Sequence, residues 1–450
     1  MSLSLPARLV VRAPAPWSLL GARGLVVGAQ PCRRSFSSTP AARLTQPQKD
    51  IVKATVPILE TGGEALTTHF YHLLLNNHPE VKPLFNQAHQ GSGRQPRALA
   101  ASILAYAKNI DDLTPLLDAV RRITNKHAAL QILPEHYPLV GASLLGAIRD
   151  VLGEEVATEE VLEAWGAAYG ELADLLIKKE ETIYHDLESA RGGWRGGRKF
   201  TVAQKIPETG IMTSFYLEPV DGRPILRHDA GQYIGLRAIV NGVEQRRNYS
   251  LSDSANDKYL RISVKREPGG AFSNYLHDRV KIGDELEVYP PVGEFVLDKS
   301  RADDPLILIS AGAGITPTIP MLESALEAGR QNITFIHCAR AEDVHAFRPV
   351  TTELAKQNPE TVKVYTVYET KDPHHVADAT GMLSLDKLKS WLPHARQADI
   401  YFLGPKPFMK GVNFYLKSMG VPEDRIHYEF FGPAEELEDN KEVPEKSAKA

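Results

Sequence analysis

The stretch TNKH at residues 124–127 is the starting point for interpreting this chain, because its histidine is a candidate metal ligand. A single histidine is more often solvated or structural than a ligand. A neutral imidazole that binds iron needs its other ring nitrogen tied to an acceptor, which fixes the tautomer and makes the ligand more basic. Glu180, further along the chain, offers such an acceptor. His127 is therefore a candidate ligand.

The surrounding third of the chain, residues 45–187, has apolar residues mainly three and four positions apart, which predicts helices. Glu180 lies on the apolar stripe of the last helix, four residues after Leu176. An unpaired buried charge is costly, so this carboxylate needs a partner. Tyr137 heads a second apolar stripe, and its hydroxyl also needs one. His127, Tyr137 and Glu180 could satisfy one another, although a structural salt bridge explains the position of Glu180 equally well.

The bulk composition points to a multidomain globular protein. A length of 450 residues suggests about three domains at roughly 100–200 residues each. No apolar run reaches the roughly 18–20 residues that a membrane span needs, so we expect none. The two cysteines, Cys32 and Cys338, cannot form a disulfide framework or a four-thiolate metal or iron–sulfur site. Any metal must be bound by other ligands or arrive inside a cofactor.

The first 43 residues differ in composition from the rest, with six arginines and no acidic residue. This pattern, rich in Ser, Ala and Leu, predicts a mitochondrial transit peptide and therefore a location in the mitochondrial matrix. A basic tail that binds nucleic acid or membrane is the alternative, but such tails tend to cluster Lys and Arg in blocks. Loss of the six arginines would lower the formal charge from −4 to −10. An acidic protein has no general attraction to nucleic acid, and we expect no such partner.

Beyond residue 187 the pattern changes twice. Residues 188–197 contain four glycines and read as a linker. Residues 198–300 alternate apolar and polar side chains in short runs, which predicts an antiparallel β-barrel. Residues 303–433 alternate short apolar strands with helical runs, which predicts a doubly wound α/β domain. Residues 434–450 are charged and lack aromatic residues, so we expect a disordered tail.

Within the α/β domain, the apolar run 306–309 leads into the sequence GAGITP at 312–317 and then the helical run 321–328. Pro317 stands where a G-x-G-x-x-G dinucleotide fingerprint has its third glycine, so that fingerprint is not satisfied.

Four further features lie between residues 46 and 185: THFY at 68–71, PLFN at 83–86, Gln95 and the stretch 124–127. In this order and spacing they resemble the globin domain of a flavohemoglobin. The resemblance implies that His127 is the proximal haem iron ligand and that Tyr137 and Glu180 form its relay. It also implies that Tyr71 and Gln95 contact bound oxygen, and that Phe85 and Leu99 line the haem pocket. Pro96 follows Gln95, so a Gln95 that capped the helix would leave its contact with the haem open.

The later motifs resemble the ferredoxin–NADP reductase family, beginning with RNYS at 247–250. An arginine fork suits phosphate oxygens, and an aromatic face suits a flavin ring. The glycine-rich turn that starts at Gly269 leads into a helix whose first backbone N–H groups suit pyrophosphate. The resemblance implies FAD contacts at Tyr233, Arg247, Asn248, Tyr249, Ser250, Gly270, Phe272, Ser273, Phe430, Phe431, Gly432 and Pro433.

The same family resemblance covers the nicotinamide nucleotide. Its implied NAD(P) contacts are Gly312, Ala313, Gly314, Ile315, Thr316, Pro317, Gly404 and Pro405. Leu403 stands where relatives have a cysteine before Gly-Pro, which leaves the hydride-transfer geometry open. Arg340 is a candidate contact for a 2′-phosphate, but the sequence does not decide between NADH and NADPH.

Together these motifs identify the chain as a flavohemoglobin, of the fungal type with a mitochondrial presequence. The resemblance implies haem b, FAD and NAD(P)H as cofactors, and nitric oxide dioxygenation as the activity. Electrons would pass from NAD(P)H through FAD to the haem, whose ferrous oxygen-bound form oxidises nitric oxide to nitrate. A hydride carrier cannot reduce a one-electron iron directly, so a flavin must lie between them. Lys126 and Glu429 are implied to form an ion pair that tunes the two redox potentials.

Two other functions remain open at this stage. One is a globin that binds or senses oxygen or nitric oxide, with a reductase that keeps its iron ferrous. The other is a flavin reductase whose helical domain carries no haem. The expected partners are nitric oxide, dioxygen and NAD(P)H, and a monomer is favoured.

Overall fold

A computed structural model of the chain describes residues 44–86, 93–370 and 376–432. The predicted transit peptide, the predicted tail and Pro433 lie outside the described residues. No helix in the described part of the chain has both the length and the apolar character of a membrane span.

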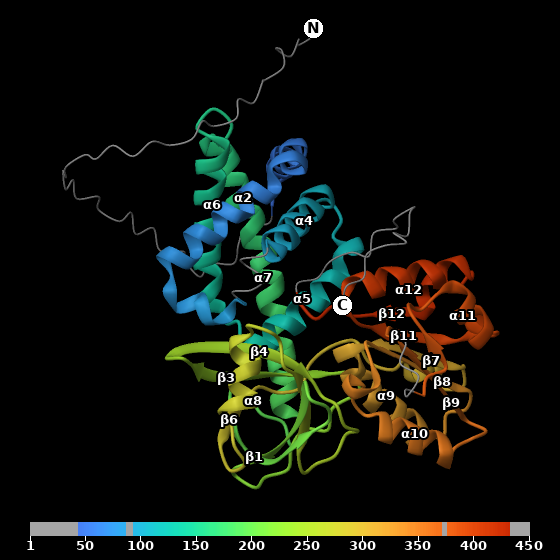
Figure 1. Ribbon diagram of the computed structural model, residues 1–450. Coiled ribbons are helices and arrows are strands. Elements are labelled where there is room, and N and C mark those ends of the chain that lie inside the picture. Colours follow the sequence, from blue (N-terminus) through green and yellow to red (C-terminus); the bar gives the residue numbers. More distant parts are fainter. Residues whose placement is uncertain (1–43, 87–92, 371–375, 433–450) are drawn as a thin grey trace, which may run out of the picture. The chain divides into compact units, whose positions relative to one another are not determined.

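The first described domain is a set of packed helices (Figure 1). Local signals explain several helix ends. Thr45 and Gln48 form a capping box at the first helix, and the Thr158 hydroxyl accepts a hydrogen bond from the N–H of Val161. Gln131, which ends the helix bearing His127, adopts the left-handed conformation with φ 56°. The helices are α1 (Gln46–Ala54), α2 (Val56–Asn77), η1 (Pro79–Leu84), α4 (Arg94–Lys108), η2 (Thr114–Leu116), α5 (Leu117–Leu130), η3 (Pro134–His136), α6 (Tyr137–Leu152) and α7 (Glu159–Ser189).

One apolar core holds these helices together. It gathers buried residues such as Leu66, Phe70 and Leu74 of α2, Leu144 of α6 and Trp165 of α7. Helix α7 continues to Ser189, two residues into the stretch assigned to the linker. Within that stretch Trp194 is buried, and its indole N–H donates to the carbonyl of Val288 at 3.2 Å. The connection is therefore packed against the next domain.

The second domain is an antiparallel sheet in the order β4-β3-β6-β1-β2-β5, with helix α8 (Ala271–Asp278). An isolated bridge between Leu251 and Ile262 joins the two ends of the sheet, which curls it into a partly closed barrel. Asn241 and Gly242, with φ 52° and 79°, form the tight turn between β3 and β4. The strands are β1 (Arg198–Pro207), β2 (Met212–Pro219), β3 (Tyr233–Val240), β4 (Val243–Ser250), β5 (Leu260–Lys265) and β6 (Glu285–Val288).

The third domain is a parallel sheet in the order β10-β9-β8-β7-β11-β12, with helices on both faces (Figure 1). Alternate residues of β7 explain the two layers: Leu306 and Leu308 enter one core, whereas Ile307 and Ile309 enter the other. Its elements are η4 (Lys299–Arg301), β7 (Leu306–Ala311), η5 (Gly312–Gly314), α9 (Ile315–Glu327), β8 (Ile333–Ala339), η6 (Glu342–Val344), α10 (Arg348–Gln357), β9 (Val362–Tyr368), β10 (Ala379–Thr380), α11 (Leu385–Trp391), η7 (Ala395–Gln397), β11 (Asp399–Leu403), α12 (Lys406–Ser418), η8 (Glu423–Arg425) and β12 (Ile426–Tyr428).

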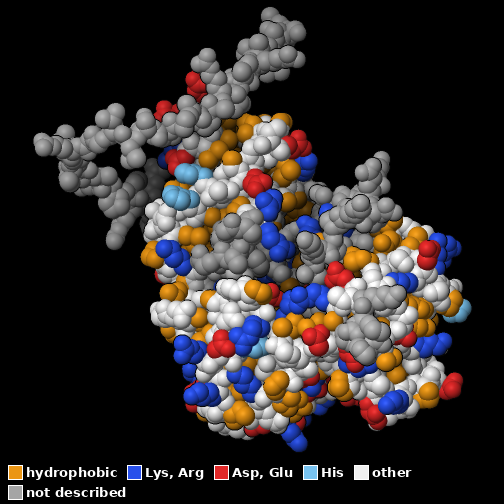
Figure 2. Space-filling view, viewed as in Figure 1, with side chains coloured by type: hydrophobic (Ala, Val, Ile, Leu, Met, Phe, Trp, Pro, Cys, Tyr) orange, Lys and Arg blue, Asp and Glu red, His pale blue; other side chains and the backbone are white. Residues whose placement is uncertain are grey.

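The predicted order of fold classes is confirmed, with one boundary shifted. Helix α9 begins at Ile315, inside the GAGITP motif, although the sequence suggested a start at Met321. Pro317 lies in the first helical turn, where a missing backbone N–H costs nothing. On the face shown in Figure 2, charges of both signs alternate with small apolar areas, as on an ordinary globular surface.

Candidate functional site

His127, Tyr137 and Glu180 meet in one hydrogen-bonded group, although they come from α5, α6 and α7. His127 Nδ1 lies 2.6 Å from Glu180 Oε1 and 3.3 Å from the Tyr137 hydroxyl. The Tyr137 hydroxyl donates to the same Oε1 at 2.6 Å. Glu180 is only 2% exposed, whereas the His127 side chain is 31% exposed. The carboxylate is thus buried behind an imidazole that keeps one accessible side.

This geometry determines which ring nitrogen is available to a metal. Burial, and secondarily the nearby Glu180 carboxylate, raises the pKa of Tyr137 far above its usual range. Tyr137 therefore stays protonated and donates to Glu180, so the carboxylate is left to accept from His127 as well. His127 Nδ1 carries the proton in this arrangement, and Nε2 presents its lone pair. The donor chemistry fits a haem iron.

A second group forms where α2 faces α4. Tyr71 is 7% exposed, and its ring lies edge-on to Phe85 with centroids 5.7 Å apart. Burial raises the pKa of Tyr71 above its usual range, so its hydroxyl remains a donor, and the Gln95 side chain hydrogen-bonds to that hydroxyl. Gln95 lies inside α4, whose N-cap residue is Gly93, so it is not the cap. Leu99 packs, half-buried, against the same apolar core.

A cavity of about 510 Å³ connects this second group to the barrel. His127, Gln95 and Leu99 are not among the described residues that line it. Both the candidate oxygen-contacting Tyr71 and the candidate flavin-contacting Arg247 do line it. The described residues that line the cavity are Thr68, Tyr71, His72, Leu75, Asn76, Lys82, Phe85, Pro96, Val243, Glu244, Gln245 and Arg247.

Arg247 has the surroundings of an anion-binding residue. Its guanidinium donates to two neutral oxygens, the carbonyl of Arg246 at 2.7 Å and Oε1 of Gln245 at 3.1 Å. Within the described residues it forms no ion pair with a carboxylate, and burial lowers the pKa of this guanidinium. A partly buried cation without a counter-charge is costly unless an anion joins it. The site therefore fits a pyrophosphate.

Other predicted flavin contacts gather around Arg247. The Phe272 ring lies 6.1 Å from the Tyr249 ring and 6.0 Å from the Arg247 guanidinium carbon. Gly270 is the N-cap residue of α8, and the Ser273 hydroxyl accepts from the N–H of Glu267 at 3.2 Å.

The remaining predicted flavin contacts lie on β3, on β4 and after β12. Tyr233 is buried and pairs in register with Ser250 across β3 and β4, and Asn248 is exposed. Phe430 packs into the core of the α/β domain, whereas Phe431 is 48% exposed.

The GAGITP turn meets the Gly404-Pro405 segment at the carboxyl ends of β7 and β11. A Cβ added to Gly314 would lie 2.1 Å from the carbonyl oxygen of Leu403 and 3.0 Å from the N–H nitrogen of Gly404. Gly312 adopts φ 53° in the same turn. Strand order reverses between β7 and β11, the usual place for a ligand in such sheets, and the N-terminus of α9 begins there. The predicted nicotinamide contacts Gly312, Ala313, Gly314, Ile315, Thr316, Pro317, Gly404 and Pro405 thus share one edge of the sheet.

The expected ion pair between Lys126 and Glu429 is not formed directly. Lys126 Nζ instead donates to the carbonyl oxygen of Gly432 at 2.6 Å. Glu429 and Lys126 still lie close enough to affect each other, since the positive charge of Lys126 opposes the effect of burial, which raises the pKa of Glu429 to about 7. The sequence did not indicate the contact of Lys126 with Gly432, because a backbone carbonyl leaves no signature in the sequence.

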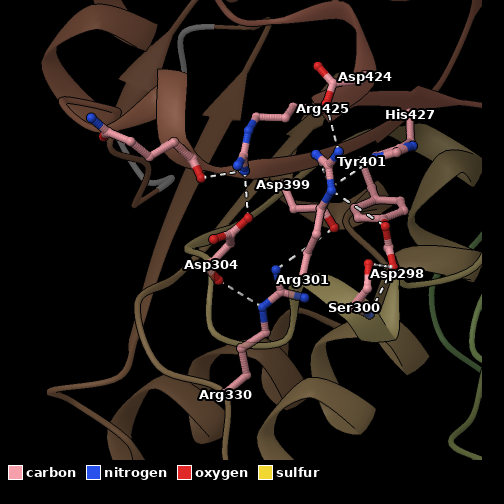
Figure 3. Close-up of polar contacts among 11 residues, drawn as sticks. Asp298, Ser300, Arg301, Asp304, Arg330, Asp399, Tyr401, Asp424, Arg425 and His427 are labelled. Carbon is pink, nitrogen blue, oxygen red and sulfur yellow. Dashed lines mark hydrogen bonds and ion pairs between the residues drawn. The ribbon is translucent and has the colours of Figure 1, made fainter.

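A buried polar cluster that the sequence reading missed anchors β12, the strand before Glu429 (Figure 3). Asp399 is fully buried at the start of β11, and its Oδ1 lies 2.7 Å from His427 Nε2. Arg301 and Arg330 lie 4.0 and 3.8 Å from the same carboxylate. The His427 ring stacks on Tyr401 with centroids 4.5 Å apart. The sequence did carry one signal of this cluster, because the acidic Asp399 begins a strand that is otherwise apolar.

A carboxylate between the barrel and the α/β domain leads to a pH prediction. Glu323 of α9 accepts from the N–H of Ser254 at 3.1 Å. Burial, and secondarily Asp253, raises the pKa of Glu323 to about 7, while Arg261 opposes the rise. The folded state therefore binds more protons than the unfolded state between pH 4.5 and 7, so this contribution to stability is present at acidic pH and lost as the pH rises through 7.

We expect Glu323→Gln to raise the free energy of unfolding at pH 8 by about 1–3 kcal/mol, the order that such a pKa difference allows. At pH 5 the gain should be much smaller. The measurement is urea unfolding at both pH values, and Glu327→Gln, at an exposed neighbour that also contacts Ser254, is the matched control. An equal gain at both pH values would contradict the assignment.

Comparison with known proteins agrees with this arrangement. Family models described as Globin, Oxidoreductase FAD-binding domain and Oxidoreductase NAD-binding domain match residues 68–176, 201–297 and 308–413. The Flavohemoprotein of Pseudomonas aeruginosa is 57% identical over 395 residues, which cover 88% of this chain and 100% of that protein. The Flavohemoprotein of Pseudomonas putida is 56% identical over the same coverage.

A solved structure also matches. The crystal structure of a flavohemoglobin from Malassezia yamatoensis with bound FAD and heme covers 87% of this chain and 100% of its own, with 28% identity and a TM-score of 0.77. Fold and site together define an oxidoreductase in which a globin is joined to a flavin- and nicotinamide-binding reductase. The chain belongs to the flavohemoprotein family.

Proposed function

We propose that this chain is a nitric oxide dioxygenase that uses NAD(P)H. The balanced reaction converts two nitric oxide and two dioxygen molecules, with one NAD(P)H, into two nitrate ions, NAD(P)⁺ and one proton. The observation that carries the proposal is the group of His127, Tyr137 and Glu180, with Nδ1 2.6 Å from the buried carboxylate. A strong acceptor behind the imidazole makes it an electron-rich ligand, which favours oxygen activation over reversible storage.

Three cofactors follow from the proposal: haem b, FAD and NAD(P)H. Haem b supplies the iron centre for oxygen chemistry, and FAD converts hydride transfer into single-electron transfer. His127 would bind the iron, with Phe85 and Leu99 beside the macrocycle. Arg247 would hold the pyrophosphate of FAD, and Tyr249 would lie along the ring. The turn at 312–317 would hold NAD(P)H.

The residues themselves have distinct roles in the reaction. The Tyr71 hydroxyl donates a hydrogen bond to dioxygen, and Gln95 orients that hydroxyl through the bond it already makes. Glu180 accepts from both His127 and Tyr137, which fixes the imidazole ring and keeps its proton on Nδ1. Lys126, which contacts the Gly432 carbonyl, and Glu429 adjust the local charge beside the cofactors.

The test is consumption of nitric oxide by the purified holoprotein, with nitrate measured. We expect consumption to need both dioxygen and NAD(P)H and to yield one nitrate per nitric oxide. Tyr71→Phe should lower the rate by about tenfold or more, the order for losing one hydrogen-bond donor to reacting atoms. Tyr106→Phe is the matched control, because the buried Tyr106 hydroxyl donates to the carbonyl of Ala168 and Tyr106 is not among the described residues that line the cavity.

Two outcomes would overturn the proposal. If NAD(P)H does not accelerate nitric oxide consumption, the protein binds or senses the gas instead. If the purified protein lacks a Soret band, the helical domain carries no haem and the chain is a flavin reductase.

The composition of residues 1–43 supports a proposed location in the mitochondrial matrix. Sequencing the N-terminus of the mature protein tests this, since retention of those residues would contradict it. We also propose a monomer, which sedimentation of the holoprotein can check.

A further inference from the structure

Helix α5, which carries His127, is one of the globin elements that contact the rest of the protein, together with η1, which packs against β4. Helix α5 packs against β3 and β4 of the barrel (Figure 1). Its contacting residues, Arg121, Asn125, Lys126, Ala129 and Leu130, recur at helical spacing and so lie on one side. Arg121 is 3.5 Å from Glu294, and the Asn125 side-chain oxygen accepts from the N–H of Gly293 at 3.1 Å. The candidate ligand His127 therefore lies on a helix that is packed within the globin domain and also contacts the barrel domain.

The end of α5 is held by a side chain of strand β4. Arg246 Nη1 donates to the carbonyl oxygen of Leu130 at 2.6 Å. That carbonyl is one of the last in the helix, which have no partner within it, and a cation there also opposes the negative end of the helix dipole. His127 lies three residues before Leu130, within the same final turn.

Arg246 is itself fixed by its neighbours. Its guanidinium pairs with Glu244 at 3.1 Å, and it lies over the Tyr289 ring at 5.5 Å. Glu244 also pairs with Arg237 at 2.6 Å, which ties the group to a second strand. A guanidinium held by a carboxylate and a ring in this way has little freedom to move. Arg246 thus fixes the end of helix α5 relative to the sheet.

A glycine on the neighbouring strand lets the helix approach. A Cβ added to Gly235 would lie 2.0 Å from the carbonyl oxygen of Ala129 and 2.8 Å from Cδ2 of Tyr289. Backbone and ring both occupy that space, so any side chain would push α5 away from β3. Gly235 and Arg246 act on adjacent carbonyls of the same helix end.

Strand β4 also carries the proposed flavin contacts, beginning at the next residue. Successive side chains of a strand point to opposite faces, so Arg246 is directed to α5 while Arg247 lines the cavity. A single strand therefore bears both the arginine that hydrogen-bonds to the end of α5 and the proposed FAD contacts. No segment of flexible chain intervenes between them.

We propose that Arg246 is a positioning residue for electron transfer: through Leu130 it fixes His127 relative to the flavin held by the same strand, and Gly235 permits that close approach. The inference rests on the proposed function, because it assumes that electrons pass from FAD to a haem on His127. It assigns to Arg246 no contact with either cofactor.

The experiment uses the full-length holoprotein and two readouts. Stopped-flow absorbance under anaerobic conditions separates FAD reduction by NAD(P)H from the haem reduction that follows. Hydrogen–deuterium exchange of the peptide covering 117–130 reports whether α5 is held. The variants are Arg246→Leu, Arg246→Lys and Gly235→Ala. Arg266→Leu is the control, because Arg266 pairs with Asp278 on the same domain at 2.8 Å and forms none of the described contacts with α5.

For Arg246→Leu and Gly235→Ala we expect FAD reduction within about twofold of wild type and flavin-to-haem transfer at least about tenfold slower, as for misplaced reacting groups. Exchange at the end of α5 should become at least about tenfold faster, the order for losing a hydrogen bond to a charged group. Arg246→Lys should recover part of the transfer rate and part of the protection from exchange. Arg266→Leu should match wild type in transfer rate and in exchange.

Three results would overturn the inference or its basis. Wild-type transfer rates in both Arg246→Leu and Gly235→Ala would refute the positioning role. Slow flavin-to-haem electron transfer with unchanged hydrogen–deuterium exchange at 117–130 would also refute the positioning role. The effect of Arg246 on electron transfer would then not act through the position of α5. If the wild-type haem accepts no electrons from FAD, the proposed function fails, while the exchange readout still decides whether Arg246 holds α5.

Discussion

Replacing His127 with alanine is expected to remove the haem and leave the flavin chemistry intact. The imidazole is the proposed iron ligand, and its Nδ1 lies 2.6 Å from the buried Glu180. Loss of a partner behind a metal-bound histidine already costs about 10–100-fold in metal affinity, so loss of the ligand itself should lower haem affinity further. FAD should remain, because Arg247, Tyr249 and Phe272 belong to another domain.

The measurement is haem per chain from the Soret band and pyridine haemochrome, together with FAD content and the rate of FAD reduction by NAD(P)H. His185→Ala is the matched control, since that side chain on α7 is 75% exposed. A His127→Ala protein that keeps haem as tightly as wild type would show that another residue is the ligand. Loss of both haem and FAD would instead point to general unfolding, which circular dichroism of the same sample would reveal.

Gly314→Ala is expected to block the other end of the electron path. The added methyl group would lie 2.1 Å from the carbonyl oxygen of Leu403, so the turn at 312–314 and the segment at Leu403-Gly404 must separate. These are the two segments assigned to the nicotinamide nucleotide. A displacement of about 1 Å at a reacting site can cost about a hundredfold in rate. We expect FAD reduction by NAD(P)H to slow by that order while FAD and haem contents stay at wild-type levels.

Reduction by dithionite provides an internal check on Gly314→Ala, because it bypasses the nucleotide and should still reduce both cofactors. Gly210→Ala is the control, since a Cβ there would meet nothing within 4 Å and its φ is not positive. Unchanged hydride transfer in Gly314→Ala would place the nicotinamide elsewhere.

The helices, their order and the two reductase domains could be predicted because each depends on local spacing. Glu180 on an apolar stripe needed a partner, and that requirement correctly pointed to Tyr137 and His127. The proposed ligand group could be predicted for the same reason: the buried Tyr137 and Glu180 side chains have few polar partners within one helical domain.

Contacts between domains could not be predicted in the same way. Arg246 and Leu130 are 116 positions apart, and the acceptor is a backbone carbonyl that any residue would supply. The requirement for glycine at 235 comes from Ala129 of another domain. The contact of Lys126 with the Gly432 carbonyl was not predicted for the same reason, although its charge also acts on Glu429 as expected.

The Arg246–Leu130 contact has a consequence for exchanging parts between relatives. The chain is divided into domains along its sequence, yet the helix that carries the candidate ligand, together with η1, forms part of the surface that joins them. A chimaera that combines a foreign globin with this reductase would have to bring a compatible α5, with a small residue at position 129 and an accessible carbonyl at 130. Homologous exchange should therefore succeed when helix 117–130, η1 and strands β3 and β4 come from one parent, even where the remaining helices come from another.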